Sequence, residues 1–321
     1  LGLTLADLLS ADWLAGQGVH ASTHVDLAVR SGAELTYGTI FGARDAVLEA
    51  RSSSSACVLV TGTDTLEDFA FCLELLLGAW LLAGGASLVV TGSMKPSDIE
   101  GYDGRANLQQ AVQVAICPPA RKMGVLVVLN DSIHLGRYVA KADSQLMGAF
   151  RSHPGPVREG RVRFYYAAPP AADDAAHSPL ADARIAALDA ARVAPWSRVG
   201  VWTTGVDGFV PEGLLREVRG LVLAAPGTGS LPSALLEQLA PWAARMPLVL
   251  VSRCQQGNNY DDNYYRGSRE KYERRGFLLS GFEHLNAVQA RSLLVFRLAA
   301  GVYEQFVPAA GRTGEGGAGG G

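Results

Sequence analysis

The stretch Val58-Leu59-Val60-Thr61-Gly62-Thr63-Asp64-Thr65 is the part of the chain that decides its fold. An apolar run leads into a glycine turn, which then presents two hydroxyls around one carboxylate. Apolar residues recur with helical spacing over residues 66–73. The Thr-Asp-Thr cluster is therefore expected between the carboxyl end of a strand and the amino end of a helix. In open α/β sheets ligands bind in that crevice, and the free N–H groups of the helix favour an anion.

The chemistry of this cluster has two interpretations. A threonine hydroxyl beside a carboxylate can take part in acyl transfer when a base or a cation assists it. Threonine and aspartate are also common helix N-caps. The stretch alone leaves both roles open.

Four further blocks follow along the chain. They are Val89-Val90-Thr91-Gly92-Ser93-Met94-Lys95-Pro96, Asp103-Gly104-Arg105-Ala106-Asn107-Leu108, Val125-Leu126-Val127-Val128-Leu129-Asn130-Asp131 and Arg137-Tyr138-Val139-Ala140-Lys141-Ala142-Asp143. Together with the Gly-Thr-Asp-Thr stretch, their order and spacing resemble the L-asparaginase family of amidohydrolases. This family includes the bacterial type I and type II asparaginases and the glutaminase-asparaginases. The resemblance runs from about residue 25 to about residue 300.

The resemblance implies a catalytic group. Thr63 and Asp64 match the family's threonine and aspartate, and Lys141 matches its lysine. In the family these residues activate a nucleophile or water and hold the substrate's α-amino group. Electrostatics supports this role, because a lysine ammonium beside a threonine Oγ stabilises the negative charge of its alkoxide form. A solvated surface lysine is the alternative for Lys141, but its small apolar neighbours favour partial burial.

The resemblance also implies a substrate-binding group. Its members are Gly62, Ser31, Gly32, Ala33, Ser93 and Met94. The loop Ser31-Gly32-Ala33-Glu34-Leu35-Thr36 matches the family's substrate-binding loop, although glycine and alanine stand where a serine and an acidic or amide residue usually grip the α-carboxylate. Backbone N–H groups near Gly62, Thr63 and Ser93 are expected to hold the negative charge that develops on the amide oxygen.

One departure from the family pattern concerns the nucleophile. The family's T-G-G-T-I turn does not occur in this sequence. The nearest string, Tyr37-Gly38-Thr39-Ile40-Phe41-Gly42, lies too close to Thr63 to leave room for a strand, a helix and a second strand. Val25-Asp26-Leu27-Ala28-Val29 is instead matched with the family's second strand. The first strand and its nucleophile turn are therefore expected upstream of Leu1, in a longer reading frame, and a natural protein that lacks this strand is the alternative.

The fold class predicted is α/β, with a doubly wound parallel-sheet N-terminal domain and a smaller, Rossmann-like α/β C-terminal domain. Apolar runs beginning at Val25, Val58, Leu88 and Val125 alternate with helical patterns. The expected divisions are a catalytic domain over residues 1–166, a linker rich in Ala, Pro and Asp over 167–197, a C-terminal domain over 198–305, and a disordered glycine-rich tail over 306–321.

The C-terminal half carries its own resemblance. Strands are expected at residues 199–202, 220–225 and 247–252, a helix from Ser233, and a closing strand and helix over 276–294. Tyr264 and Tyr265 are candidates for ligand contact, with ordinary packing as the alternative. In the family this domain reaches into a neighbouring subunit's site, which implies a homodimer or homotetramer.

The charge and apolar content of the chain limit the kinds of partner that it is expected to bind. A formal charge of −3 without a basic stripe argues against nucleic acid. The apolar run over residues 75–90 is broken by Gly78, Gly84 and Gly85, so it predicts a buried helix end, a turn and a core strand rather than a membrane span. No metal or organic cofactor is expected. The expected partner is a small amino-acid amide substrate.

The cysteines and histidines suggest no metal site. Cys57, Cys72, Cys117 and Cys254 lack metal or redox spacing, and all four are expected to be buried thiols. Free thiols favour a reducing, cytoplasmic compartment, with a periplasmic one open if a signal peptide lies upstream of Leu1. His20 and His24 are expected at the surface, and His134 in a loop near the site.

The function expected from these observations is hydrolysis of L-asparagine to L-aspartate and ammonia. Two alternatives remain. One is a non-catalytic member of the family that binds an amino acid or assembles with a partner. The other is a related amidohydrolase acting on glutamine, D-asparagine or an amide in a larger substrate.

Overall fold

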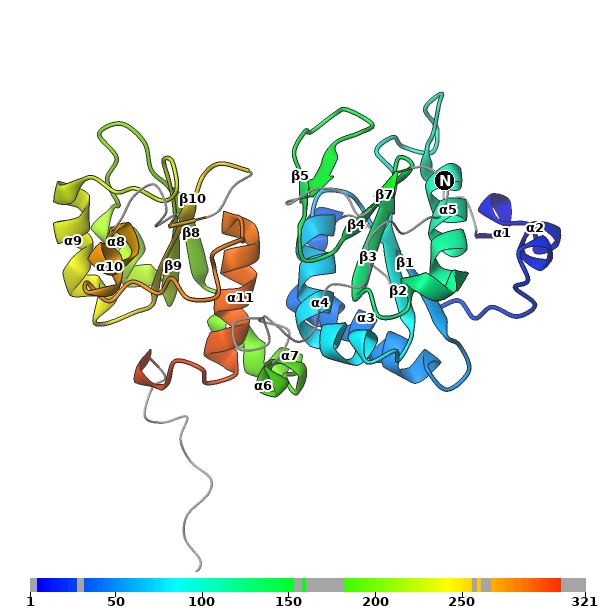
Figure 1. Ribbon diagram of the computed structural model, residues 1–321, viewed down its shortest axis with the longest axis horizontal. Coiled ribbons are helices and arrows are strands. Elements are labelled where there is room, and N and C mark those ends of the chain that lie inside the picture. Colours follow the sequence, from blue (N-terminus) through cyan, green and yellow to red (C-terminus); the bar gives the residue numbers. More distant parts are fainter. Residues whose placement is uncertain are drawn as a thin grey trace, which may run out of the picture.

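The computed structural model describes residues 5–27, 32–152, 158–159, 182–255, 259–260 and 267–306. Two lobes stand side by side, and a long helix of the second lobe faces the first (Figure 1). The helices before the first strand are α1 (Leu5–Leu8), α2 (Ala11–Gly16), the short 3-10 helix η1 (Gly32–Glu34) and α3 (Tyr37–Ala50).

The first lobe is built on a mixed five-stranded sheet of order β1-β2-β3-β4-β7. Its strands are β1 (Ala56–Val60), β2 (Ser87–Thr91), β3 (Val125–Leu129), β4 (Ser132–Leu135) and β7 (Arg158–Glu159). The first three are parallel, whereas β4 runs antiparallel to β3 and β7 antiparallel to β4. Every residue of β2 and β3 is buried, as expected for strands covered on both faces.

Helices cover both faces of this sheet. Helix α4 (Leu66–Leu82) packs with α3 on one face, where Leu88, Val90 and Val127 point. Helix α5 (Gly104–Ile116), followed by η2 (Pro118–Ala120), packs on the other face, against Leu126 and Val128. Neighbouring strand residues thus point to opposite layers, which is the alternation expected of a pleated strand.

A separate two-stranded hairpin carries the predicted lysine. It consists of β5 (Val139–Lys141) and β6 (Phe150–Ser152), which pair antiparallel with Lys141 opposite Phe150. The hairpin stands above the end of the main sheet and beside α4 (Figure 1). Its position brings a residue far along the chain back to the turn after β1.

The second lobe has a parallel sheet of order β10-β9-β8. Its elements are β8 (Val199–Thr203), α8 (Glu212–Glu217), β9 (Gly220–Ala225), α9 (Ser233–Ala243), β10 (Leu248–Ser252), α10 (Ser268–Glu273), α11 (Ala287–Ala299) and η5 (Glu304–Phe306). Leu221, Leu223 and Leu250 point into a core shared with α8, α9 and α10. Val222 and Val249 point the other way, toward α11.

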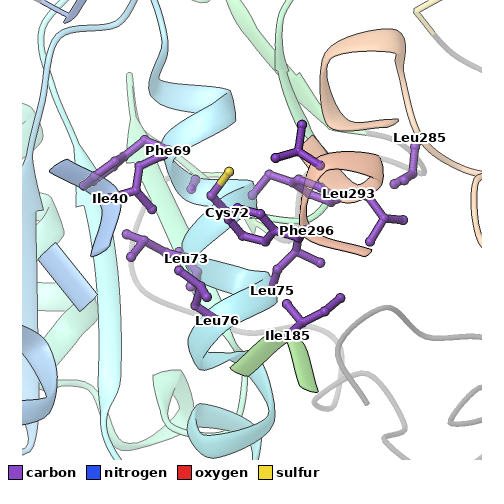
Figure 2. Packing of buried hydrophobic residues seen from close by; sticks show 14 of the residues in the cluster. Ile40, Phe69, Cys72, Leu73, Leu75, Leu76, Ile185, Leu285, Leu293 and Phe296 are labelled. Atoms are coloured by element: carbon purple, nitrogen blue, oxygen red, sulfur yellow. The ribbon is translucent and has the colours of Figure 1, made fainter. Parts of the chain in front are cut away.

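Helix α11 joins the two lobes through one continuous apolar core. Figure 2 shows Leu293 and Phe296 of α11 lying against Cys72, Leu73, Leu75 and Leu76 of α4. Phe296 also lies 6.1 Å, ring centre to ring centre, from Phe41 of α3.

The segment expected to be a linker is ordered over the part that the structure describes. It forms α6 (Ala183–Ala186), α7 (Ala190–Val193) and η4 (Ala194–Trp196). Ile185, Leu188 and Val193 are buried in the core shared by both lobes. The alanine-rich composition that suggested a linker supports short helices, since alanine has the best helix propensity.

Several local expectations need correction. A strand was expected at residues 25–29, but residues 25–27 are irregular and Val25 is 66% exposed. In the part of the chain that the structure describes, no strand lies beside these residues to accept and donate their backbone hydrogen bonds. His134 lies in β4 rather than in a loop. The closing strand reduces to a single bridge between Val249 and Leu278.

Other expectations hold. The string around Thr39 is the first turn of α3, capped by Thr36, and is therefore no strand-to-loop turn. The run over residues 75–90 divides into the end of α4, a turn and β2. None of the described helices is both long enough and apolar enough to cross a membrane.

The cysteines are only partly as expected. All four are unpaired, and Cys72 is buried. Cys57 and Cys117 are half-buried, and Cys254 is exposed. The prediction of buried thiols is therefore confirmed for Cys72, met only in part by Cys57 and Cys117, and wrong for Cys254. Cys254 follows the end of β10, where the chain leaves the sheet for a surface loop.

Candidate active site

Thr63 and Asp64 lie in the turn between β1 and α4. Thr63 is 9% exposed, whereas Asp64 is open to solvent. Thr65 stands at the N-cap position of α4 but makes no capping bond with its side chain. Its hydroxyl instead donates to the carbonyl oxygen of Gly32, at 2.6 Å. The cluster therefore does not serve as a side-chain cap for α4, and its polar groups face the neighbouring loops.

Lys141 brings the third group to this turn. Its ammonium donates to Thr63 Oγ1 at 3.1 Å and lies 3.5 Å from Asp64 Oδ1. The lysine side chain is 17% exposed and the aspartate side chain 67%. A solvated surface lysine is thus excluded, and a hydroxyl, a carboxylate and an ammonium from distant parts of the chain meet at one end of the sheet.

Close backbone packing joins three loops around this group. A β-carbon at Gly62 would lie 3.0 Å from the backbone nitrogen and Cα of Gly32. One at Gly92 would lie 2.4 Å from the carbonyl oxygen of Thr61 and 3.5 Å from a methyl group of Thr63. Only glycine allows the backbones to approach so closely. The close approach of these three loops therefore requires glycine at positions 32, 62 and 92.

The predicted substrate-binding residues differ in burial, and one of them lies outside the described residues. Gly32 is buried beside Gly62, and Ala33 is exposed next to it. Ser93 and Met94 are half-buried and directly follow Gly92. Ser31 lies outside the described residues, as do Tyr264 and Tyr265. The structure thus brings the 32–33 and 92–94 segments to the turn that holds Thr63.

Asp103 and Asn107 support this arrangement, and no role was assigned to them from the sequence. The Asp103 carboxylate accepts the backbone N–H groups of Met94, at 2.9 Å, and Lys95, at 3.0 Å. Asn107 donates to the Gly92 carbonyl oxygen at 2.9 Å and to Asp103 Oδ2 at 2.7 Å. The Met94 N–H is therefore committed to Asp103 and is no donor for a ligand. The Asp103-to-Asn107 spacing of four, one helical turn, was the available signal.

Glu67 was also missed. It lies in the first turn of α4, and its carboxylate accepts the backbone N–H of Lys141. Burial raises the pKa of this carboxyl to about 7, and the bond from Lys141 opposes part of that rise. In the sequence, Glu67 resembles any acidic residue at a helix start.

This arrangement of groups can support acyl transfer. A cation next to the Thr63 hydroxyl favours its alkoxide form, and the carboxylate of Asp64, which is 67% exposed beside Lys141, can be reached by a substrate's ammonium. Within the described ranges, no group of three or more His, Cys, Asp or Glu side chains could hold a metal ion.

Comparison with known proteins agrees with this geometry. Residues 14–169 match the model of the asparaginase N-terminal domain, and residues 203–306 that of the glutaminase/asparaginase C-terminal domain. A probable L-asparaginase of Deinococcus radiodurans is 36% identical over 243 residues, covering 76% of this chain and 70% of that protein.

More distant relatives show the same likeness. L-asparaginase 2 of Escherichia coli is 30% identical over 250 residues, covering 75% of this chain and 65% of that protein. The glutaminase-asparaginase of Pseudomonas fluorescens biotype A is 32% identical over 201 residues, covering 62% of this chain and 52% of that protein. The alignments with these two relatives therefore span less than two thirds of those proteins.

A solved structure shares the fold across both lobes. The probable cytoplasmic L-asparaginase of Campylobacter jejuni superposes with a TM-score of 0.72 at 22% identity, covering 95% of this chain and 91% of that one. Taken with the two domain matches, these likenesses extend over most of the sequence. The chain belongs to the asparaginase family of amidohydrolase enzymes.

Proposed function

We propose that the chain hydrolyses the side-chain amide of L-asparagine, giving L-aspartate and ammonia. The observation that carries the proposal is the contact of the Lys141 ammonium with Thr63 Oγ1, at 3.1 Å, beside the carboxylate of Asp64. Relatives named L-asparaginase support the choice of substrate.

Each group has a chemical part in the proposal. Asp64 is exposed and pairs with the α-ammonium of the substrate. Lys141 polarises the Thr63 hydroxyl, so that Thr63 or a water that it orients attacks the amide carbon. When Thr63 attacks, its hydroxyl proton passes to the amide nitrogen as the carbon–nitrogen bond breaks, so that ammonia leaves and an ester on Thr63 remains. Water then hydrolyses this ester and restores the Thr63 hydroxyl; when Thr63 only orients a water, that water attacks the amide carbon directly and its proton goes to the leaving nitrogen. Water supplies the oxygen of the new carboxylate.

Backbone N–H groups near Gly62, Thr63 and Ser93 are proposed to hold the oxyanion. One such donor is worth about 3–4 kcal/mol of transition-state stabilisation. The exposed Gly62 and half-buried Ser93 lie on two loops that close packing keeps together.

The test is ammonia release from L-asparagine by the wild type and by Thr63→Val. The valine keeps the shape of threonine but removes the hydroxyl, so turnover is expected to vanish while circular dichroism and thermal unfolding stay unchanged. Asn107→Ser, in the loop support, is a control that leaves Thr63 and Lys141 in place and should lose less activity. Full activity in Thr63→Val would disprove the role of the hydroxyl.

Glutamine is the second candidate substrate. Two relatives are named glutaminase-asparaginase, which favours testing it beside asparagine. A wild type that binds L-aspartate in calorimetry but releases ammonia from neither amide would instead support the amino-acid-binding alternative.

Assembly and compartment belong to the same proposal. We infer a homodimer or homotetramer, supported by apolar side chains left in solvent on the C-terminal lobe, Val206 at 97% and Phe209 at 64% exposure. The four unpaired cysteines favour a reducing, cytoplasmic compartment.

A further inference from the structure

The outer edge of strand β5 carries backbone groups that its partner strand does not satisfy. The N–H of Ala142 donates to the carbonyl oxygen of Ala149, at 2.8 Å, across the hairpin. Because successive residues of an antiparallel strand direct their backbone groups to opposite sides, the N–H of Lys141 points away from β6. The backbone that carries the active-site lysine thus depends on acceptors and donors from elsewhere.

Two side chains from different lobes meet this outer edge. Glu67 of α4 accepts the Lys141 N–H. Gln289 of α11 donates through Nε2 to the carbonyl oxygens of Val139, at 3.3 Å, and Arg137, at 3.2 Å.

Gln289 is itself firmly held. Its side chain is 2% exposed, and its Oε1 accepts the backbone N–H of Asn286 at 3.2 Å. Asn286 in turn caps the first turn of α11, so that the two residues form a capping box. The Gln289 side chain is therefore fixed by hydrogen bonds at both its oxygen and its nitrogen.

We propose that Glu67 and Gln289 are positioning residues, which hold the outer edge of β5 and so keep the Lys141 ammonium within hydrogen-bond reach of Thr63. The inference rests on the proposed function and extends it to residues that do not touch the substrate. It also gives the C-terminal lobe a part in the site, through Gln289.

The geometry explains why a second attachment is needed. Lysine has a long flexible stem, and ordering it costs conformational entropy. The ion pair with Asp64 is 3.5 Å long and open to solvent, so it holds the stem weakly. Glu67 lies in the first turn of α4, four residues after Thr63 in the chain. Lys141 is thus attached to the same turn twice, by its backbone and by its side chain.

The bond that Glu67 accepts requires an oxygen rather than a charge. A glutamine at this position keeps the oxygen in the same place, whereas a leucine of similar size removes it. The comparison of these two variants therefore separates positioning from mere filling of space.

The experiment compares Glu67→Gln, Glu67→Leu and Gln289→Leu with the wild type. Asp68→Asn is the matched control, because Asp68 is the adjacent half-buried carboxylate on α4 but faces Ser292, at 3.5 Å, instead of β5. The measurements are kcat and KM for ammonia release from L-asparagine, thermal unfolding, and hydrogen–deuterium exchange of the backbone at residues 139–142.

We expect kcat to fall about 10- to 100-fold in Glu67→Leu and Gln289→Leu, the range for a small misplacement of a catalytic group, while KM changes little. Glu67→Gln and Asp68→Asn should stay within about threefold of the wild type. Exchange at Lys141 should become faster in Glu67→Leu and remain slow in Glu67→Gln.

An unchanged kcat in Glu67→Leu, or an equal loss in Asp68→Asn, would overturn the proposal. The exchange measurement does not depend on catalysis. If the wild type releases no ammonia, the proposed function fails, yet faster exchange at Lys141 in Glu67→Leu still supports the attachment. Unchanged exchange in that variant overturns it.

Discussion

At the scale of single residues, His134 carries a buried neutral imidazole. Its Nδ1 lies 2.6 Å from Ser152 Oγ, so it joins β4 to the hairpin that holds Lys141. Burial, followed by the charge of Arg151, lowers the pKa of His134 to about 4. The fold therefore favours the neutral ring, whose unfolded pKa is the ordinary 6.5.

The sign of the pH dependence follows. The stabilising contribution of His134 is fully present above pH 6.5, and it is lost as the pH falls from 6.5 to about 4, because the unfolded chain takes up the proton first. The loss amounts to about 3 kcal/mol at most. His134→Gln, which cannot be protonated, is expected to flatten this part of the curve. Urea unfolding at pH 5 and pH 7 measures the unfolding free energy of both proteins. An equal change of this free energy with pH in the wild type and in His134→Gln would contradict the assignment.

At the scale of elements, one buried ion pair connects α4 to the sheet and to the segment before β5. Glu74 of α4 is fully buried, and its carboxylate lies 2.7 Å from Arg137 Nη2. The same carboxylate accepts the backbone N–H of Val125, the first residue of β3. Gly124, with φ +78°, leaves the space that the carboxylate fills, since a β-carbon there would lie 2.6 Å from it.

Removal of one partner should therefore be costly. Glu74→Leu leaves the Arg137 guanidinium buried without its carboxylate, and a loss of about 3–5 kcal/mol in unfolding free energy is expected. Glu74→Leu combined with Arg137→Met should cost clearly less than the two single changes added together. A double-mutant cycle by urea unfolding measures the coupling, and strict additivity would show that the pair is not coupled.

Some elements could be predicted from the sequence because their signals are local. The apolar runs at 88–91 and 125–129 gave β2 and β3, and the helical spacing after Thr65 gave α4. Strand β4 was missed, since only Asn130 and Asp131 separate it from β3. Their positive φ values, 47° and 60°, make a two-residue hairpin turn, for which this pair is a weak sequence signal.

The residues of the candidate site were also predictable only in part. Thr63, Asp64 and Lys141 were predictable because they lie in recognisable blocks. Glu67 was not, because its partner is a backbone N–H that lies 74 residues further along the chain. A backbone group has no residue type, so no spacing in the sequence reveals it. The two-lobed α/β fold itself was predicted correctly, although the first sheet is mixed.

At the scale of the whole molecule, β1 forms one edge of the first sheet among the residues that the structure describes. Its residues are half-buried and Val60 is 62% exposed, unlike the fully buried β2. An apolar strand edge of this kind is a template for pairing with another chain.

Val60→Lys should reduce such association, because a lysine on an edge strand hinders edge-to-edge pairing. Static light scattering during storage at increasing protein concentration would measure the change. Val201→Lys, on the edge strand β8 of the other lobe, is the matched control, with Val201 39% exposed. Equal protection by both substitutions would show that the effect is not specific to the β1 edge.

The shared core of α4 and α11 has a practical consequence for anyone who divides this protein. Each helix packs on the sheet of its own lobe and also buries part of its apolar surface against the other helix, and the short helices at 183–196 pack beside both. A fragment ending near residue 152, or one starting near 198, would expose to water the apolar surface that α4 and α11 bury against each other. The halves are thus poor candidates for expression as independent modules, or for exchange between relatives without their facing helix.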